Sequence, residues 1–403
     1  MKYVVILGDG MADYPVPQLG NKTPLDVARK PYIDMLAGKG EIGLVKTVPD
    51  DLPPGSDVAN LSVMGYNPYK YYTGRSPLEA VSMGIDLGCD DTSFRTNLVT
   101  LSDETEYSKK TMIDYSSDEI TTQEAHILLS AVNTELKSDI LNFYGGISYR
   151  HLLVWHKCDK LFNLTPPHDI SGRIITEYLP NSEIILNLMK RSYEILKDHP
   201  INVSRIEKGL HPANSIWIWG QGKKPELAKF KDKYGIDGAV ISAVDLVKGI
   251  GICSQMRSID VDGATGNIHT NFDAKAQATI DALNSVDFAY VHIEAPDECG
   301  HRFEVDNKVR AIELIDEKIV KPIFEALYSK NEPFSIMVLP DHATPLALGT
   351  HVNDAVPFAI YKSYDIRVSE LCYNETDAAE GIYISDGYTL MDYFIGGEKN
   401  ARK

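Results

Sequence analysis

Residues 334–345 read FSIMVLPDHATP, and this stretch decides the class of fold. Its first half, Phe334–Leu339, is almost wholly apolar and stops abruptly before Asp341 and His342. A short, continuous apolar run of this kind is typical of a strand that is buried on both faces, as in a parallel sheet covered by helices. Polar side chains that follow such a strand lie at its carboxyl end, where open α/β sheets bind their ligands.

Similar apolar runs recur along the chain and stop at polar or glycine residues; they lie at residues 3–8, 215–219, 239–243, 288–293 and 357–361. Between some of these runs, residues 274–283 and 305–327 carry apolar side chains at helical spacing. Strands that alternate with helices predict an α/β fold, with a mostly parallel sheet and helices on both of its faces. We therefore expect the polar ends of these strands to gather at one edge of the sheet.

The middle of the chain follows a different pattern. It contains two hairpin-like strands, a helix, a further strand and an amphipathic helix, at residues 94–101, 110–115, 122–136, 149–156 and 182–198. This mixture predicts a separate α+β domain at residues 89–211. The domain would be inserted into a core formed by residues 1–88 and 212–403.

Composition and charge narrow the classes of partner. The chain has 403 residues, 43% hydrophobic and 24% charged, and a formal net charge of −17. Such an acidic protein is not expected to bind nucleic acid or an anionic membrane, whereas a small anionic substrate can still be held by local arginines and metal ions. The five cysteines form no CxxC pair, and no apolar segment has the length of a signal sequence or membrane span. We therefore expect a cytoplasmic protein; the sequence does not indicate an oligomeric state.

Aspartate and histidine side chains gather near the ends of the predicted strands, at Asp9, Asp297, His301, Asp341, His342 and His351. Asp297 and His301 are four residues apart, so a helical turn places them on one face, where they can share a metal ion. Taken singly, each of these residues has an ordinary explanation, such as a helix cap or a surface histidine. Together they offer enough oxygen and nitrogen ligands for two divalent metals, and such a site favours phosphoryl chemistry.

A candidate nucleophile lies in residues 53–66, which read PPGSDVANLSVMGY. The Pro-Pro-Gly turn places Ser56 where a helix begins, close to the positive end of the helix dipole and to unpaired N–H groups. Ser56 has no obvious base beside it, but a metal bound to its oxygen would favour the alkoxide. From the residues alone, an ordinary N-cap role for Ser56 is the stronger interpretation, because serine is a favoured N-cap.

The order of these motifs resembles the cofactor-independent phosphoglycerate mutases of the archaeal type, within the alkaline phosphatase superfamily. The matching stretches are ILGDGMAD, PPGSDVANLSVMGYNP, YYTGRSPLEAVSMGI, AVDLVKGIG, HIEAPDECGH, LPDHATP and GTHVNDAVPF. The resemblance covers the chain from Met1 to about Tyr361. It implies an alkaline-phosphatase-like core with an inserted cap domain that binds substrate.

The resemblance also implies roles for individual residues. Ser56 matches the serine that carries the phosphoryl group. One metal would be held by Asp9, Ser56, Asp341 and His342, and the other by Asp297, His301 and His351. Family members typically use Mn²⁺, with Zn²⁺, Co²⁺ or Mg²⁺ as alternatives; mixed oxygen and imidazole ligands do not separate Mn²⁺ from Zn²⁺ or Co²⁺.

The implied reaction is the interconversion of 3-phosphoglycerate and 2-phosphoglycerate in glycolysis, through a phosphoserine and without bisphosphoglycerate. Glycerate would stay trapped under the cap while it reorients, since water would otherwise turn the enzyme into a phosphatase. The candidate donors for the substrate are Arg95, Asn97, Arg150, His151, Arg173 and Lys248, and the alternative for each is a surface salt bridge or a solvated loop. His168 and Asp169 would transfer the proton of glycerate, whereas His292 lies within an apolar strand and is expected to be a core residue.

Three other functions remain open from the sequence. The superfamily also contains phosphatases, phosphopentomutases, phosphonate hydrolases and sulfatases, which differ mainly in the cap. Some similar proteins have been proposed to act as homoserine kinases, although this chain has no GxxxxGK loop for ATP. The third alternative is a metal-dependent binding or scaffold protein without turnover. Loss of Ser56 or of a metal ligand would have favoured it, but all of these residues are present.

Overall fold

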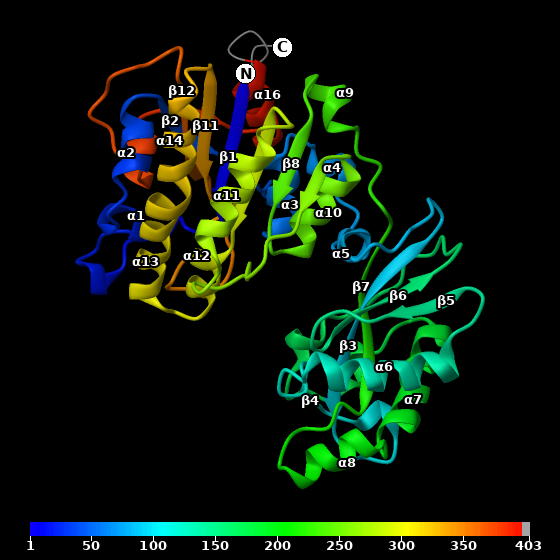
Figure 1. The fold of residues 1–403 in the computed structure, drawn as a ribbon. Helices are drawn as coiled ribbons and strands as arrows, with labels where there is room; N and C mark the ends of the chain where they lie inside the picture. Colours follow the sequence, from blue (N-terminus) through cyan, green and yellow to red (C-terminus); the bar gives the residue numbers. More distant parts are fainter. Residues whose placement is uncertain (397–403) are drawn as a thin grey trace. The chain divides into compact units, whose positions relative to one another are not determined.

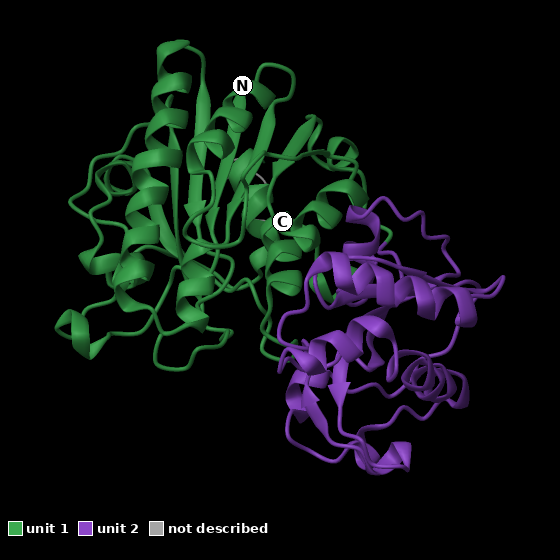
Figure 2. Cartoon of the chain, turned by 60° about the horizontal axis from the view of Figure 1, so that its bottom comes forward, with its two compact units in different colours: residues 1–72, 226–403 green, residues 73–225 purple. Residues whose placement is uncertain are grey.

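The computed structural model describes residues 1–396, and the chain divides into two compact units. Unit 1 consists of Met1–Tyr72 and the chain from Glu226 on, and unit 2 is Thr73–Pro225 (Figure 2). Within residues 1–396, no helix is long and apolar enough to cross a membrane.

Unit 1 is built on an eight-stranded sheet with the order β13-β2-β12-β11-β1-β10-β8-β9. Its strands are β1 (Lys2–Gly8), β2 (Glu41–Val45), β8 (Gly238–Ile241), β9 (Arg257–Ile259), β10 (Phe288–Ile293), β11 (Phe334–Leu339), β12 (Val356–Lys362) and β13 (Ile382–Ile384). Within this sheet β12 alone runs against its neighbours, and all other pairs are parallel. The predicted α/β class with a mostly parallel sheet is confirmed.

Helices cover both faces of this sheet (Figure 1). One face packs against α1 (Pro24–Val27), α2 (Pro31–Gly38), α11 (Phe272–Ala282), α13 (Val305–Ile315), α14 (Lys321–Ser329) and α15 (Glu375–Ala379), with the π-helical segment Asp316–Val320 joining α13 to α14. The other face meets α3 (Ser56–Val63), α9 (Phe230–Tyr234), α10 (Asp245–Cys253) and α16 (Leu390–Gly396), and α4 (Pro68–Tyr71) packs beside α3. Along β10, Ala289, Val291 and Ile293 face the first layer, whereas Tyr290 faces α3.

The carboxyl ends of β1, β10 and β11 meet at one edge of the sheet. Gly8 pairs with Ile293, and Leu7 pairs with Leu339, in parallel register. The aspartates that follow β1 and β11 therefore emerge beside α12 (Ala295–His301), the helix that follows β10. The strand register thus brings residues from opposite ends of the chain together.

Unit 2 contains an antiparallel sheet with the order β4-β3-β6-β5, in which β7 also pairs with β3. Its strands are β3 (Thr92–Leu101), β4 (Met112–Asp114), β5 (Leu141–Tyr144), β6 (Arg150–Trp155) and β7 (Ser215–Gly222). Its helices are α5 (Ser76–Ser82), α6 (Thr122–Leu136), α7 (Glu183–Leu196) and α8 (Pro200–Glu207). Side chains from α6 and α7 share one apolar core with the strands.

Residues 215–219 do not form a parallel strand of the core, so that part of the sequence-based prediction is wrong. They begin β7, which runs antiparallel to β3. A buried strand has the same apolar pattern in either kind of sheet, so the local sequence could not indicate its partner. With β7 and α5 included, unit 2 extends beyond the predicted limits of 89–211 to residues 73–225.

Candidate metal centre

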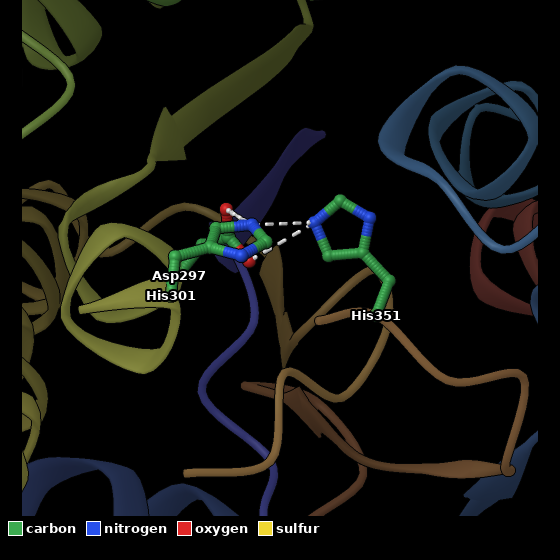
Figure 3. Close-up of side chains that lie close together, drawn as sticks. All are labelled: Asp297, His301 and His351. Carbon is green, nitrogen blue, oxygen red and sulfur yellow. Dashed lines mark hydrogen bonds and ion pairs between the residues drawn. The ribbon is translucent and has the colours of Figure 1, made fainter. Parts of the chain in front are cut away.

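Three side chains converge beyond the end of β10 (Figure 3). Asp297 and His301 lie one turn apart on α12, with 3.2 Å between His301 Nε2 and Asp297 Oδ2. His351 faces them from the loop before β12, where its Nε2 lies 3.4 Å from Asp297 Oδ1 and 2.9 Å from His301 Nε2. Ligand atoms of the three residues lie within 4.8 Å of one another, which is an arrangement that suits a divalent metal.

The backbone orients His301 as a ligand. Its Nδ1 lies 2.9 Å from the carbonyl oxygen of Gly349, so an Nδ1–H donates there and Nε2 faces Asp297 and His351. Burial would raise the pKa of Asp297, but hydrogen bonds from His301 and His351 hold that pKa well below its usual value. The same hydrogen bond to Asp297 raises the pKa of His301 to about 9. A metal ion would take the place of that imidazolium proton.

A second, fully buried cluster adjoins the first. His292 Nε2 lies 2.9 Å from Asp9 Oδ2, and His342 Nε2 lies 3.6 Å from Asp9 Oδ1 and 3.5 Å from Asp341 Oδ2. None of these four residues is more than 2% exposed. The rings of His342 and His351 have their centroids 4.0 Å apart, so the two clusters are neighbours.

The buried carboxylates of the second cluster suit a cation. Burial, and then the charges of Asp341 and Asp297, raise the pKa of Asp9 well above its usual value. Among the described residues, Asp9 Oδ1 has no hydrogen-bond partner, and a buried polar atom without a partner is costly. Burial lowers the pKa of His342, which therefore keeps a lone pair to offer. The donor set fits a divalent metal, because such an ion would neutralise the carboxylates and give Asp9 Oδ1 a partner.

Ser56 lies at the edge of the second cluster. It is the first residue of α3, and Gly55 before it is the N-cap, so the interpretation of Ser56 as an N-cap is wrong. Its Oγ lies 3.1 Å from His342 Nε2. The unpaired N–H groups of the first helical turn lie nearby and favour negative charge. Ser56 thus has no capping role and has its oxygen beside the candidate ligands.

Three residues that the sequence analysis did not assign to the site support it: His292, Thr344 and Lys308. Thr344 donates its hydroxyl proton to Asp297 and lies 3.3 Å from His342 Nδ1, so it touches both clusters. The ammonium group of Lys308, which is fully buried, donates to the carbonyl oxygen of Thr344 at 2.8 Å. His292 and Thr344 lay within recognised motifs, whereas Lys308 carried no local signal.

Gly10 leaves the room in which these contacts form. A Cβ atom at this position would lie 2.6 Å from Asp297 Oδ1 and 2.6 Å from Thr344 Oγ1. Its φ of +61° is also a conformation that residues with a side chain rarely adopt. Glycine is therefore required for the close approach of the turn after β1 to α12.

Unit 2 carries a separate cluster of basic and aromatic side chains. Arg95 lies with its guanidinium carbon 4.3 Å from the centre of the Trp219 ring, and its Nε is 3.2 Å from Glu79. Trp219 donates from Nε1 to Asn97 Oδ1 at 2.9 Å, and its ring centroid lies 5.3 Å from that of His168. Arg95 and Asn97 are two residues apart on β3, so they lie on one face of the sheet.

Basic side chains gather on this face of unit 2. Arg150 joins it, because the register of β3 and β6 places Arg150 opposite Asn97. Burial lowers the pKa of Arg95; the charge of Glu79 opposes this shift, and the charges of Arg75 and Arg150 add to it. His168 lies 3.6 Å from Asp169. Arginines that repel one another would be stabilised by a bound carboxylate or phosphate.

Three other predicted substrate residues have surroundings of their own. The alternation along β6 turns His151 to the opposite side of the sheet, where burial lowers its pKa to about 3. Arg173 donates to the hydroxyl group of Tyr178 at 3.1 Å. Lys248 belongs to unit 1, where it pairs with Asp260 at 2.7 Å.

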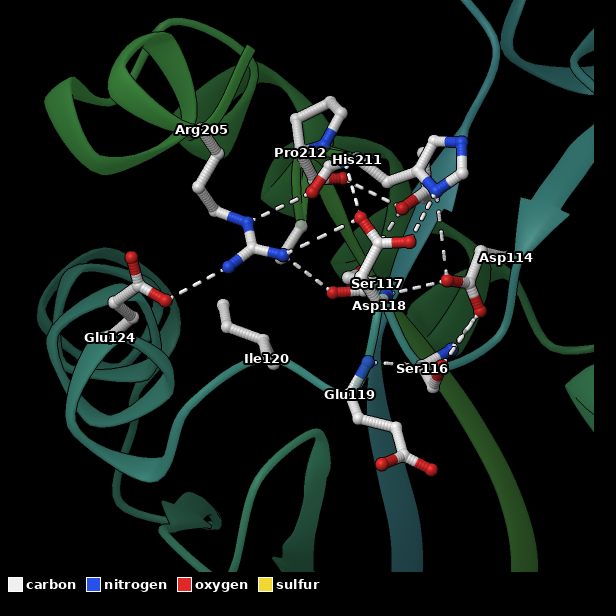
Figure 4. A network of polar contacts seen from close by, with 12 residues as sticks. Asp114, Ser116, Ser117, Asp118, Glu119, Ile120, Glu124, Arg205, His211 and Pro212 are labelled. Atoms are coloured by element: carbon white, nitrogen blue, oxygen red, sulfur yellow. Dashed lines mark hydrogen bonds and ion pairs between the residues drawn. The ribbon is translucent and has the colours of Figure 1, made fainter. Parts of the chain in front are cut away.

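Unit 2 has a further group of acids and histidine around Asp118 (Figure 4). Asp118 Oδ2 accepts from the backbone of His211 at 2.6 Å, and Oδ1 from His211 Nδ1 at 2.8 Å. Asp114 Oδ1 accepts from the backbone and the hydroxyl group of Ser116, both at 2.8 Å. The buried cation of Arg205 lies 4.0 Å from Asp118 Oδ2, which opposes a metal there. We assign this network a structural role, because it ties the turn before α6 to the chain that enters β7.

Two kinds of comparison identify relatives of this chain. The sequence profile of the family described as 2,3-bisphosphoglycerate-independent phosphoglycerate mutase matches residues 37–202. A protein of that name from Methanosarcina barkeri is 50% identical over 369 residues, which cover 90% of this chain and 91% of the relative. A probable one from Geobacter sulfurreducens is 46% identical and covers 98% of this chain and 100% of the relative.

Two solved structures share the fold. The PH0037 protein from Pyrococcus horikoshii is 28% identical, with a TM-score of 0.84 over 100% of this chain and 98% of that one. The cofactor-independent phosphoglycerate mutase from Thermoplasma acidophilum is 25% identical, with a TM-score of 0.66 over 98% of this chain and 99% of that one. These likenesses confirm the resemblance seen in the motifs, and the chain belongs to the 2,3-bisphosphoglycerate-independent phosphoglycerate mutase family.

Proposed function

We propose that this protein interconverts 3-phosphoglycerate and 2-phosphoglycerate by passing the phosphoryl group through Ser56, without bisphosphoglycerate. The observation that carries the proposal is the place of Ser56 Oγ, 3.1 Å from His342 Nε2 at the start of α3. Two clusters of carboxylate and imidazole groups lie beside it. Membership of the family and the close likeness of whole chains support the same reaction.

We propose that the two clusters hold two divalent metals. Asp297, His301 and His351 would hold one, and Asp9, Ser56, Asp341 and His342 the other, with His292 orienting Asp9. When bound, these ions lower the pKa of the serine hydroxyl and neutralise phosphate oxygens. Mn²⁺ is our first choice, and Zn²⁺, Co²⁺ and Mg²⁺ are the alternatives for this donor set.

The reaction then proceeds in two phosphoryl transfers. Ser56 reacts as the alkoxide, and its oxygen bonds to phosphorus while the bond from phosphorus to the C3 oxygen of the substrate breaks. The departing oxygen takes a proton, a step that we assign to His168 with Asp169. The C2 hydroxyl of glycerate then gives its proton back to the same pair, and its oxygen bonds to phosphorus while the bond from phosphorus to the Ser56 oxygen breaks, which restores the Ser56 alkoxide.

We further propose that unit 2 supplies the donors for the substrate carboxylate. Arg95 and Arg150 offer planar forks that match a carboxylate. Trp219 holds both Arg95 and Asn97, so it sets the geometry of this face. The unit would act as the cap that keeps glycerate from leaving and water from entering.

The deciding experiment is an assay of metal-stripped protein with added Mn²⁺ and 3-phosphoglycerate, without bisphosphoglycerate. We expect metal-dependent formation of 2-phosphoglycerate with little release of inorganic phosphate. Release of phosphate alone would overturn the mutase in favour of a phosphatase. Absence of both products, together with phosphorylation of homoserine by ATP, would overturn it in favour of a kinase.

Replacing His301 by alanine tests the division of the ligands. The variant should lose one bound metal and keep the other, because the second cluster has its own ligands. The measurement is the metal content per chain after loading with Mn²⁺ and gel filtration. His269→Ala, an exposed histidine of the same unit, is the control and should keep the wild-type content. An unchanged metal content in His301→Ala would contradict the assignment.

Replacing Arg95 by lysine tests the anion-binding face of unit 2. Lysine keeps the charge but loses the planar fork and the stacking on Trp219, so KM for 3-phosphoglycerate should rise by about 10-fold or more. Steady-state kinetics with Mn²⁺ give the KM. Arg191→Lys is the matched control, since Arg191 lies on α7 and donates to the carbonyl oxygen of Glu135. Equal KM values in the two variants would remove Arg95 from the substrate site.

A further inference from the structure

A chain of buried hydrogen bonds runs from the middle of the sheet to a candidate metal ligand. Tyr290 on β10 donates its hydroxyl proton to Asn60 Oδ1 at 2.7 Å. Asn60 on α3 donates from Nδ2 to Asp341 Oδ2 at 2.8 Å. All three side chains are 0% exposed. Buried polar groups are nearly always hydrogen-bonded. In this series of hydrogen bonds each donor points toward Asp341.

The orientation of the Asn60 amide follows from its partners. Nδ2 also donates to the backbone carbonyl oxygen of Ser56 at 2.9 Å. The two groups that meet Nδ2 are both acceptors, so a flipped amide would set its oxygen against two oxygens. Oδ1 is therefore left to accept from Tyr290.

The position of Asn60 couples the nucleophile to the ligand. Asn60 is four residues after Ser56 on α3, so both lie on one side of the helix. One amide group thus contacts the carbonyl group of Ser56 and the carboxylate of Asp341 at the same time. Asp341 Oδ1 accepts hydrogen bonds from two backbone N–H groups, that of His342 at 3.0 Å and that of Gly10 at 3.4 Å. Oδ2, the oxygen that faces His342 Nε2, is oriented by the side chain of Asn60.

The alternation of β10 places two supporting side chains on the face toward α3. Tyr290 and His292 are two residues apart, so both point to this face. Tyr290 supports Asp341 through Asn60, and His292 contacts Asp9 directly. One strand thus supports two aspartates of the second cluster.

We propose that Asn60 and Tyr290 are positioning residues that hold Asp341 and the start of α3 in register for phosphoryl transfer. Neither touches the substrate; Asn60 acts on the ligand, and Tyr290 acts through Asn60. The inference rests on the proposed function for its role in turnover, but its effect on metal binding can be measured without turnover. Mutation of a residue that orients a metal ligand typically lowers metal affinity or activity by about 10- to 100-fold.

The test compares Tyr290→Phe, Asn60→Leu and the double variant with Tyr373→Phe. Tyr373 is the matched control, because it is equally buried in unit 1 and its hydroxyl group donates to the carbonyl oxygen of Pro357 at 2.9 Å. Each metal-stripped protein is titrated with Co²⁺, followed by its visible absorption, and kcat and KM are measured with Mn²⁺. Thermal unfolding of each stripped protein reports the purely structural cost.

We expect Asn60→Leu to lower the affinity for one Co²⁺ by about 10- to 100-fold and kcat by a similar factor, with little change in KM. Tyr290→Phe should also lower the Co²⁺ affinity and kcat, but by a smaller factor than Asn60→Leu. The double variant should be no worse than Asn60→Leu alone, because the two residues act on one carboxylate in series. Tyr373→Phe should lower the unfolding temperature to the extent that Tyr290→Phe does and leave metal affinity unchanged.

Two results would overturn the inference: a Co²⁺ affinity in Tyr290→Phe equal to that in Tyr373→Phe, or additive losses in the double variant. If Asn60→Leu does not fold, the comparison of the two tyrosine variants decides alone. If the variants bind Co²⁺ more weakly but the wild type makes no 2-phosphoglycerate, the positioning role is supported and the proposed function is overturned. The two failures are therefore distinguishable.

Discussion

Ser56→Ala should lower kcat for phosphoryl transfer by on the order of 10⁶-fold, the scale on which removal of a covalent nucleophile acts. Alanine has no oxygen that could take the phosphoryl group from the substrate. The fold should stay intact, since Gly55 and not Ser56 caps α3 and alanine favours a helix. We expect the free energy of unfolding to change by less than about 0.5 kcal/mol.

The measurement is the coupled mutase assay, with mass spectrometry of the acid-quenched wild type to locate a phosphorylated peptide containing Ser56. Ser329→Ala is the control, because Ser329 ends α14 and its hydroxyl group donates to the carbonyl oxygen of Ala326. Turnover in Ser56→Ala within tenfold of the wild type, or phosphate on another residue, would rule out the covalent route.

Lys308→Met should destabilise unit 1 by about 3–5 kcal/mol, which is the usual cost of removing one partner of a buried ion pair. Lys308 Nζ lies 2.7 Å from Asp13 Oδ2, and the two side chains are 0% and 1% exposed. Methionine fills much of the volume but leaves the carboxylate of Asp13 buried without its cation. The carbonyl oxygen of Thr344 also loses a donor, so the loop that carries His342 should loosen.

Urea unfolding of the metal-stripped protein gives the free energy of unfolding. Lys318→Met is the matched control: Lys318 lies 3.5 Å from Asp273 on the surface, where solvent screens the pair, so little change is expected. Adding Asp13→Leu to Lys308→Met should recover part of the loss, because it removes the unpaired charge. A loss in Lys308→Met no larger than in Lys318→Met would show that the buried pair is not needed.

Several elements were predictable because their local pattern has one interpretation. Residues 288–293 and 334–339 form β10 and β11 within the predicted limits, since a strand buried on both faces reads as a continuous apolar run. Helix α6 begins at Thr122, after a threonine that caps it by accepting from the backbone of Glu124. In these segments, the signals for burial and for helix capping both come from residues that are close together in the sequence.

Other features of the structure depended on residues far away in the chain and could not be predicted from a local pattern. The apolar run at 215–219 was assigned to the core sheet, but its partner is β3, and only strand pairing decides between two sheets. His292 is buried as expected, yet it lies against Asp9, which an apolar strand pattern cannot indicate. The placement of His151 with Arg150 in the substrate site is a different case, because it conflicts with a local rule: neighbours on a strand point to opposite faces.

The sequence by itself determined which side chains end the strands, that α12 carries Asp297 and His301 on one face, and that Ser56 begins a helix, since these depend on local spacing. The sequence also predicted that Asp9, Asp297 and Asp341 lie at one edge of the sheet, but only the tertiary structure decided that β1 lies between β10 and β11, whose parallel register brings the three strand ends together. The tertiary structure also decided the roles of Asn60, Tyr290 and Lys308. A hydrogen bond acts over about 3 Å, and which groups come within that distance depends on the packing of elements distant in the chain.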